Sequence, residues 1–268
     1  MRILNTIAIV SLLISGFAVA ADKVIMEGST TVLPIAQACA ERLMDKNKDV
    51  DITVRGGGSG VGIASIIDST CTIGDASRAI KSSEIKKALE RGVDPKGNVV
   101  AMDGIAVVIN PSNTIKAFTK KQVKDIYIGA ISDWSQLGGV PGKIVVFSRD
   151  TSSGTYEAFG ALALGGTKPK PDALLQASNQ AVVTSVAKTP QGIGYAGLGY
   201  VNDSVKAIPV DGVECTKTTV LSAKYPLSRP LYMYTNGKPQ GNAKIVIDFI
   251  LSEEGQKIVE EQGFVALK

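Results

Sequence analysis

The chain has 268 residues, of which 29 are Lys or Arg and 25 are Asp or Glu, so its formal net charge is +4 at pH 7. It contains no histidine. The Ser-His-Asp triad, the most frequent general base and the commonest metal ligand are therefore excluded. The basic excess is small and forms no cluster interleaved with aromatic residues, so nucleic-acid binding has no support.

The first twenty residues have the pattern of a secretory signal peptide. Arg2 is their only charged residue, an apolar run extends over Ile7–Val19, and Ala18-Val19-Ala20 fits a cleavage site. The alternative is a membrane anchor, but the run is short for a helix that needs roughly 20 residues to span a bilayer. We therefore expect export, cleavage after Ala20, and a soluble mature protein without a lipid anchor, because no cysteine follows the cleavage site.

Beyond this segment, short apolar strands alternate with stretches of helical periodicity. Strands are predicted at Val24–Met26, Ile52–Val54, from Ile73 onward, and at Asp103–Asn110, Ile144–Phe147, Gly192–Val201, Val205–Val210 and Arg229–Thr235. Helices are predicted after Val32, around Ile63–Ile67, over Glu84–Arg91 capped by Ser82 or Ser83, after a capping box at Thr119–Gln122, over Tyr156–Leu164 and Ala181–Ala187, and on both sides of Ser252–Gly255. The alternation predicts an α/β fold with mainly parallel strands.

No low-complexity linker divides the chain, so two lobes would have to be joined through strands. The glycine-rich segment Gly192–Gly199 is a candidate hinge. A closely packed strand inside one lobe is an equal alternative for this segment.

Three cysteines are present, at Cys39, Cys71 and Cys215. Cys39 falls on the apolar face of a predicted helix, which favours a small buried side chain. Cys71 and Cys215 lie in polar surroundings, and we predict a disulfide between them because an oxidising compartment permits one. The absence of C-x-x-C spacing argues against a metal site.

Three segments repeat one design, in which a strand ends, glycine and hydroxyl residues follow, and a helix begins. They are Gly28-Ser29-Thr30-Thr31, Gly58-Ser59-Gly60 and Arg149–Thr155. Helix N-termini present unpaired N–H groups and partial positive charge, and glycine lets an anion approach the backbone closely. Helix capping alone would explain any single turn. Three turns at the carboxyl ends of strands predict an anion site.

Arg149 adds a permanent cation whose planar fork suits an oxyanion. The alternative for this residue is a surface salt bridge with a neighbour such as Asp150. None of the three turns has the phosphate-loop spacing that ends in Gly-Lys-Ser/Thr, so nucleotide hydrolysis is not indicated.

These motifs together resemble the phosphate-binding proteins of bacterial ABC importers. The matching segments, in chain order, are Gly28-Ser29-Thr30, Gly57–Gly60, Ile73–Arg78, Asp103–Ala106, Asp133-Trp134, Arg149–Thr155, Gly192–Tyr195 and Arg229–Tyr232. The resemblance covers essentially the whole mature chain, and Arg149–Thr155 is its most specific part.

The resemblance implies a two-lobed periplasmic binding protein of type II, in which each lobe is a mainly parallel sheet flanked by helices and the ligand lies in the cleft between the lobes. Residues 21–104 and 200–268 would form the first lobe and residues 105–199 the second. Carried over by position, the ligand contacts would be Ser29, Thr30, Ser59, Ser77, Arg149, Ser153, Gly154 and Thr155.

In the best-known members of this family an Asp accepts a proton from the ligand, in the loop that matches Asp75–Arg78. The alignment leaves two possibilities open, because Arg78 can occupy the Asp position while Asp75 faces elsewhere, and both residues are kept as candidate contacts. Phosphate near neutral pH carries a proton and sulfate does not. A buried carboxylate would therefore favour phosphate, because sulfate would leave that carboxylate unsatisfied.

The expected function is capture of inorganic phosphate by hinge closure, without catalysis or cofactor, and delivery to the membrane permease of an ABC importer. The protein is expected to be a periplasmic monomer. Alternatives are a binding protein of the same fold for another oxyanion such as sulfate, a secreted phosphatase, or a phosphate sensor. A phosphatase would need an activated nucleophile, and no histidine or carboxylate cluster is available to provide one.

Overall fold

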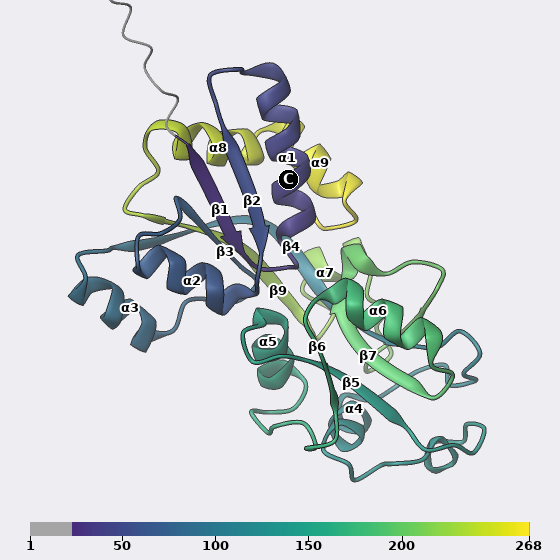
Figure 1. The fold of residues 1–268 in the computed structure, drawn as a ribbon. Coiled ribbons are helices and arrows are strands. Elements are labelled where there is room, and N and C mark those ends of the chain that lie inside the picture. The colour runs from purple at the N-terminus through teal and green to yellow at the C-terminus, as the bar shows by residue number, and fades with distance from the viewer. Residues whose placement is uncertain (1–22, 268) are drawn as a thin grey trace, which may run out of the picture.

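The computed structural model describes residues 23–267, so the predicted signal peptide and its cleavage site after Ala20 lie outside the described residues. Two lobes lie side by side, each with its own helices around a set of strands (Figure 1). One path of hydrogen-bonded strands runs through both lobes in the order β2-β1-β3-β9-β4-β7-β5-β6, with β8 also paired to β4. The α/β class is therefore confirmed.

The first lobe combines the N-terminal elements with the C-terminal helices. Its strands are β1 (Val24–Gly28), β2 (Ile52–Gly56), β3 (Ile73–Ala76), β9 (Ser228–Asn236) and the first part of β4 (Pro95–Ile109). Its helices are α1 (Leu33–Lys46), α2 (Ser59–Ile67), α3 (Ser82–Glu90), α8 (Gly241–Leu251) and α9 (Glu253–Glu261).

The second lobe is built on the end of β4. Its other strands are β5 (Val145–Arg149), β6 (Leu174–Gln176), β7 (Gly192–Gly197) and β8 (Lys206–Ile208). Its helices are α4 (Lys120–Tyr127), α5 (Gly154–Leu162), α6 (Asn179–Lys188) and α7 (Lys217–Leu221), with short 3-10 turns η1 (Trp134–Leu137) and η2 (Leu198–Tyr200).

Strand direction is mixed. β1 is parallel to β2 and β3, and β5 is parallel to β6 and β7, as the alternation of strands and helices predicts. Every pair that involves β4 or β9 is antiparallel. These two strands connect the lobes, and the order of elements along the chain does not reveal their direction.

The chain crosses between the lobes at two adjacent places. β4 leaves the sheet of the first lobe near Gly104, and the chain returns at Leu227, whose carbonyl accepts a hydrogen bond from the Ile105 N–H at 2.9 Å. Gly192–Gly197 lies instead between β4 and β5 inside the second lobe. Of the two alternatives for this segment, the structure therefore shows the closely packed strand and not the hinge. The packing leaves no room for a side chain at Gly194, where a Cβ would lie 2.6 Å from the Val182 side chain.

The division of the chain into lobes at residues 104/105 and 199/200 remains a prediction. Apolar side chains after residue 200 pack with β4, α4 and β7 in the second lobe; they include Ile208, Val210, Val220, Tyr225 and Leu227. This packing favours a return boundary next to Ser228, at the start of β9, over one at residue 200.

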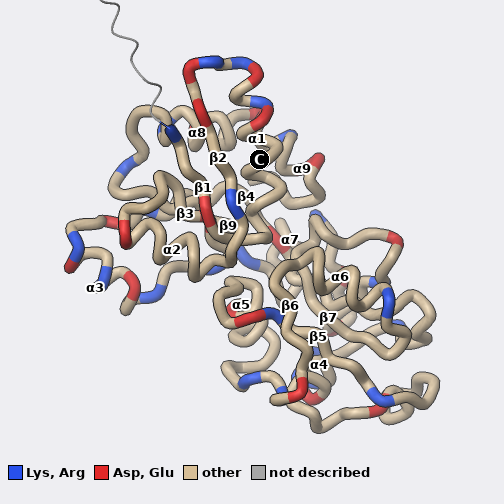
Figure 2. Tube along the Cα trace, in the orientation of Figure 1, with Lys and Arg blue, Asp and Glu red and all other residues tan. Residues whose placement is uncertain are grey.

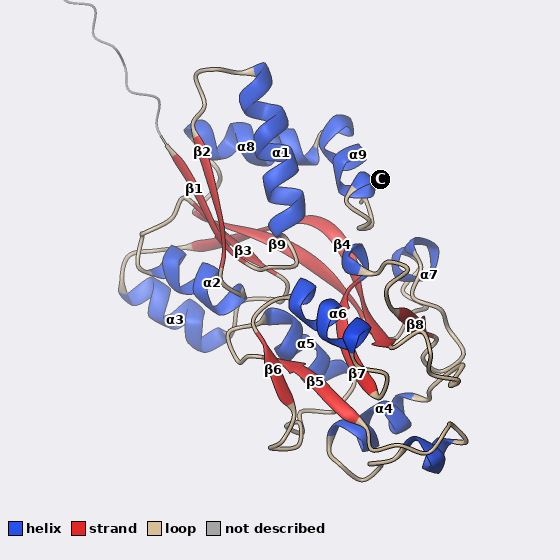
Figure 3. Ribbon diagram, turned by 45° about the vertical axis from the view of Figure 1, so that its right-hand side comes forward, coloured by secondary structure: helices blue, strands red, loops and turns tan. Residues whose placement is uncertain are grey.

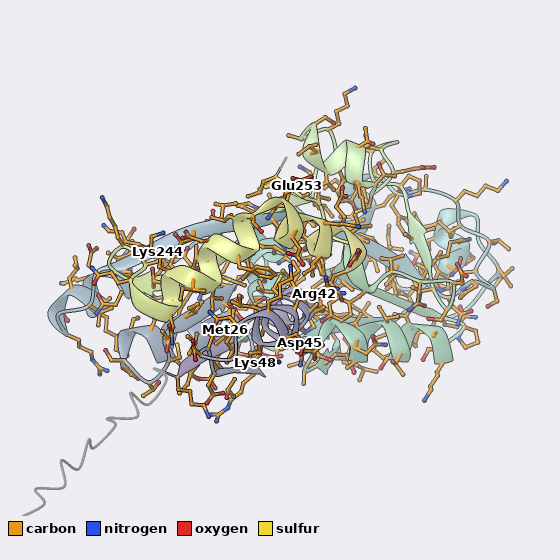
Figure 4. The ribbon with its side chains drawn as sticks, turned by 90° about the horizontal axis from the view of Figure 1, so that it is seen from above. Met26, Arg42, Asp45, Lys48, Lys244 and Glu253 are labelled. Carbon is orange, nitrogen blue, oxygen red and sulfur yellow. The ribbon has the colours of Figure 1, made fainter. Side chains whose placement is uncertain are left out.

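The C-terminal helices complete the first lobe by packing on α1. In the view from above, Arg42 of α1 lies next to the α8–α9 pair, on which Lys244 and Glu253 are labelled (Figure 4). Arg42 Nη1 lies 3.1 Å from Glu254 Oε1. This contact joins α1 to α9, two segments more than 200 residues apart.

Local signals set several helix starts. At Thr119 the predicted capping box is confirmed, since the Thr119 hydroxyl accepts from the Gln122 N–H at 3.1 Å and the Gln122 side chain accepts from the Thr119 N–H at 2.7 Å. α3 differs from the prediction, because Lys81 occupies the cap position in place of Ser82 or Ser83. The Glu84 carboxylate accepts a hydrogen bond from the Lys81 N–H at 2.8 Å, so the N–H group at the cap position has a partner.

The predicted disulfide between Cys71 and Cys215 is wrong, because all three cysteines are free. Cys71 packs against the Ile66 cluster of the first lobe, whereas Cys215 packs on the apolar clusters of the second lobe. Burial raises the pKa of both Cys39 and Cys71 to about 12, so these thiols stay protonated near neutral pH.

Within residues 23–267 no helix combines the length and the apolar character needed to cross a bilayer. The same part of the chain holds no group of three or more Cys, Asp or Glu side chains placed to bind a metal ion. Acidic and basic positions are interspersed over both lobes (Figure 2).

Candidate functional site

Four helices begin at the junction of the lobes, two from each side. α1 and α2 follow β1 and β2 in the first lobe, and α5 and α6 follow β5 and β6 in the second. α5 and α6 lie where the second lobe meets the first (Figure 3). Each start presents N–H groups and the positive end of a helix, so this junction is suited to an anion.

Arg149, the last residue of β5, lies at this junction with only 1% of its surface exposed. Its Nε donates to the Gln176 carbonyl at 2.9 Å, and its Nη2 donates to the Ala177 carbonyl at 3.0 Å and to Thr30 Oγ1 at 3.2 Å. The second terminal nitrogen, Nη1, is buried and has no hydrogen-bond partner among the described residues.

The charge of Arg149 is poorly compensated. The Asp150 carboxylate is 3.9 Å from Nη2, which is beyond hydrogen-bond distance. Burial lowers the pKa of Arg149, but a guanidinium keeps its proton in a protein. A buried cation with a free N–H is costly unless an anion pairs with it.

Hydroxyl and amide groups connect the two lobes around this arginine. Asn179, at the start of α6, donates to Thr30 Oγ1 at 3.2 Å and to Thr31 Oγ1 at 3.0 Å. Thr31 Oγ1 also lies 3.0 Å from Thr155 Oγ1 on α5. Thr31 and Asn179 are absent from the set predicted from sequence, because their role depends on which strand ends meet across the junction.

A second buried arginine, Arg229, is neutralised by Asp103. Its Nη2 and Nε donate to Asp103 Oδ2 at 2.8 and 3.0 Å, and its Nη2 also donates to Thr155 Oγ1 at 3.0 Å. Burial raises the pKa of Asp103, and the Arg229 guanidinium offsets part of that effect. The charges of Arg229 and Asp103 neutralise each other. Arg149 is therefore the buried arginine at the junction whose charge is available to an anionic ligand.

Ser59 and Ser77 face the second lobe through Gly154. Ser59 Oγ accepts from the Ser77 N–H at 2.9 Å and lies 3.3 Å from Ser77 Oγ. A Cβ on Gly154 would lie 2.2 Å from Ser59 Oγ and 2.7 Å from Ser77 Oγ. Only glycine permits the start of α5 to approach the first lobe this closely.

The remaining serines of the predicted set accept backbone N–H groups near helix starts, Ser29 in the turn before α1 and Ser153 as the cap of α5. The Ser29 hydroxyl accepts from the Thr31 N–H at 3.1 Å, and the Ser153 hydroxyl accepts from the Tyr156 N–H at 3.2 Å. Their lone pairs are therefore engaged with the backbone, while each hydroxyl hydrogen stays available to a ligand.

The structure does not bring Arg78 into this network. Its two terminal nitrogens each lie 2.8 Å from a Glu84 carboxylate oxygen, and its Nε lies 3.1 Å from Glu157 Oε1. The terminal nitrogens thus donate to Glu84 and to the Ala79 carbonyl, while Nε forms an ion pair with Glu157 and has no hydrogen-bond partner among the described residues. None of these contacts involves the residues around Arg149.

Asp75 also stands apart. Asp75 lies on the same sheet face as Ile73, and it is paired in register with Met233 on β9. Both Ile73 and Met233 belong to the apolar cluster beneath α1 and α8. Neither carboxyl oxygen has a hydrogen-bond partner within residues 23–267. Burial alone raises the pKa of Asp75 well above its usual value, so the group is held as a neutral acid.

Asp75→Asn is expected to stabilise the protein at pH 8. An unfolded Asp ionises near pH 3.9. Because the folded-state pKa is raised, the free energy of unfolding is highest below that pH and falls as pH rises through the folded pKa. Urea unfolding at pH 4 and pH 8 should show the variant about 1–3 kcal/mol more stable at pH 8 only. Equal stability of both proteins at pH 8 would contradict this.

The comparisons with known proteins agree with this geometry. The sequence profile of the PBP superfamily domain matches residues 16–254. The phosphate-binding protein PstS of Bacillus subtilis is 34% identical over 251 residues, which are 92% of this chain and 81% of that protein. PstS of Borreliella burgdorferi is 34% identical over 253 residues, covering 90% of this chain and 88% of that protein.

The chain belongs to the PstS family of the PBP superfamily.

Solved structures of family members have the same fold. A Clostridium perfringens protein, described as a phosphate ABC transporter substrate-binding protein with bound phosphate, is 37% identical with a TM-score of 0.86, covering 92% of this chain and 100% of that one. An ABC-type phosphate transport receptor from Vibrio cholerae is 31% identical with a TM-score of 0.76, covering 90% and 99%. The type II binding-protein fold implied by the sequence is confirmed.

Proposed function

We propose that this protein captures inorganic phosphate between its two lobes and delivers it to the permease of an ABC importer. The observation that carries this proposal is the unpartnered Nη1 of Arg149, a buried residue at the junction where four helices begin. An oxyanion there would supply the missing acceptor and the missing negative charge. The names of the PstS relatives support phosphate as that anion.

The proposed ligand contacts come from both lobes, which couples binding to closure. Ser29, Thr30, Ser59 and Ser77 would donate from the first lobe, and Arg149, Ser153, Gly154 and Thr155 from the second. An open form would present only half of these donors, so the anion would favour the closed form.

Binding without catalysis is part of the proposal. The chain has no histidine, and the described residues hold no metal-binding group of carboxylates at the junction. The site hydroxyls are bonded to one another and to amide and guanidinium donors, so no base is positioned to activate one of them. We further propose an exported periplasmic monomer whose signal peptide is cleaved after Ala20.

Discrimination between phosphate and sulfate depends on an acceptor for the phosphate proton. Arg78 carries only donors, and Asp75 lies on the sheet face of the apolar cluster beneath α1 and α8, so neither supplies the proton acceptor expected from sequence. The phosphate proton would then be accepted by a Ser or Thr oxygen. A hydroxyl can donate to sulfate equally well, so we expect the preference for phosphate to be smaller than a carboxylate would give.

The test is calorimetric titration of protein freed of ligand by unfolding and refolding, with phosphate and sulfate in parallel. We expect saturable one-to-one phosphate binding and weaker sulfate binding. At about 1,000 times the dissociation constant, the ligand should stabilise the fold by about 4 kcal/mol in a thermal melt. Absence of phosphate binding up to millimolar concentration would overturn the proposal, and tighter sulfate binding would reassign the anion.

A further inference from the structure

A cluster of four charged side chains joins the lobes outside the anion site. Arg78 and Lys81 follow β3 in the first lobe, and Glu84 lies in the first turn of α3 in the same lobe. Glu157 lies in the first turn of α5 in the second lobe. α5 lies beside the α2–α3 region in both ribbon views (Figures 1 and 3).

Glu157 binds two cations across the junction. Its Oε1 lies 3.1 Å from Arg78 Nε, an ion pair without hydrogen-bond geometry, and its Oε2 lies 2.6 Å from Lys81 Nζ. Arg78 also holds Glu84, through two contacts of 2.8 Å, but that pair lies wholly within the first lobe. Opening the cleft would break both contacts of Glu157 and leave the Arg78–Glu84 pair intact.

The burial of these groups gives the contacts of Glu157 more weight than surface pairs have. The Arg78 side chain is 8% exposed and that of Glu157 is 21% exposed, whereas that of Lys81 is 52% exposed. A pair shielded from water is less screened than a surface pair. Glu157 also lies at a helix N-terminus, where a negative charge is favoured.

We propose that Glu157 is an affinity-determining residue that touches no ligand. It acts by holding the closed form through Arg78 and Lys81. This inference rests on the proposed function, because lobe closure on an anion is what the contact would favour. The Arg78 side chain, expected from sequence to meet the ligand, would then contribute from outside the site.

Glu157→Gln and Glu84→Gln form a matched pair for the test, since both glutamates bind Arg78 and only one belongs to the other lobe. Glu157→Gln should weaken phosphate binding by about 5- to 20-fold and speed phosphate dissociation in stopped-flow measurements. The affinity of this variant should also depend less on salt concentration than that of the parent protein. Glu84→Gln should leave the affinity unchanged or slightly tighter, because Arg78 would then serve Glu157 alone. Lys81→Gln should weaken binding about twofold.

The proposal fails if Glu157→Gln binds phosphate as tightly as the parent protein, or if Glu84→Gln weakens binding as much. If the parent protein binds no phosphate, the proposed function fails, and small-angle X-ray scattering of the ligand-free proteins decides the role of Glu157. A larger radius of gyration for Glu157→Gln than for Glu84→Gln at low salt would support the contact as a closure device, and equal radii would overturn it.

Discussion

Arg149→Met is expected to weaken phosphate binding by about 100-fold or more. The variant removes the only buried cation that lacks an acid partner at hydrogen-bond distance among the described residues, together with the free Nη1 donor. Truncating one partner of a buried, charge-assisted hydrogen bond costs several kcal/mol of binding energy. Calorimetric titration measures the loss, and a thermal melt should show no shift at phosphate concentrations that stabilise the parent protein.

Two further variants separate the geometry of Arg149 from its charge. Arg149→Lys keeps the positive charge and loses the planar fork, so it should retain part of the affinity. Arg55→Met removes an exposed arginine near the second helix start and should bind as the parent does. Phosphate binding by Arg149→Met within threefold of the parent would mean that the anion lies elsewhere.

The parts of the site that could be predicted from sequence are those with a local cause. Glycine and hydroxyl residues between a strand and a helix mark the starts of α1, α2 and α5, and Ser29, Ser59 and Gly154 are found at these positions. Arg149 is recognisable because it ends a core strand immediately before such a turn.

The parts that could not be predicted depend on contacts between distant segments. Thr31, Asn179 and the Arg229–Asp103 pair enter the site only because β1, β6, β9 and β4 meet at the junction. Arg78 was expected at the ligand, but its guanidinium binds Glu84 of its own lobe and forms an ion pair with Glu157 of the other lobe. The polar surroundings of Cys71 and Cys215 carried no information about the separate clusters in which they pack.

The same dependence on distant contacts explains the mixed strand directions. A helix between two strands implies a parallel pair, and this holds for β1–β2 and β5–β6. Between β8 and β9 the chain forms only the short helix α7, so the order of elements leaves the direction of β9 open. The antiparallel pairing of β9 with β4 places Arg229 opposite Asp103 in register. This ion pair lies where the chain crosses between the two lobes.

Asp103→Asn is expected to destabilise the protein by about 3–5 kcal/mol, because it leaves the charge of Arg229 buried without its partner. Asp103 is 0% exposed and Arg229 is 4% exposed. For a protein of this size the loss corresponds to a fall in Tm of about 6–20 °C, measurable by circular dichroism. Asp68→Asn breaks the exposed pair with Arg91 and should cost less than about 1 kcal/mol.

The double variant Asp103→Asn/Arg229→Met separates the penalty of an unpaired charge from the worth of the pair. Removing both charges leaves no buried ion, so the double variant should recover a large part of the stability that Asp103→Asn loses. Its phosphate binding should still weaken, because Arg229 also donates to Thr155 Oγ1 at 3.0 Å and positions that residue at the junction of the lobes. A double variant less stable than Asp103→Asn would instead show that the hydrogen bonds of Arg229 to Thr155 and to the Ser77 carbonyl stabilise the crossing more than the ion pair does.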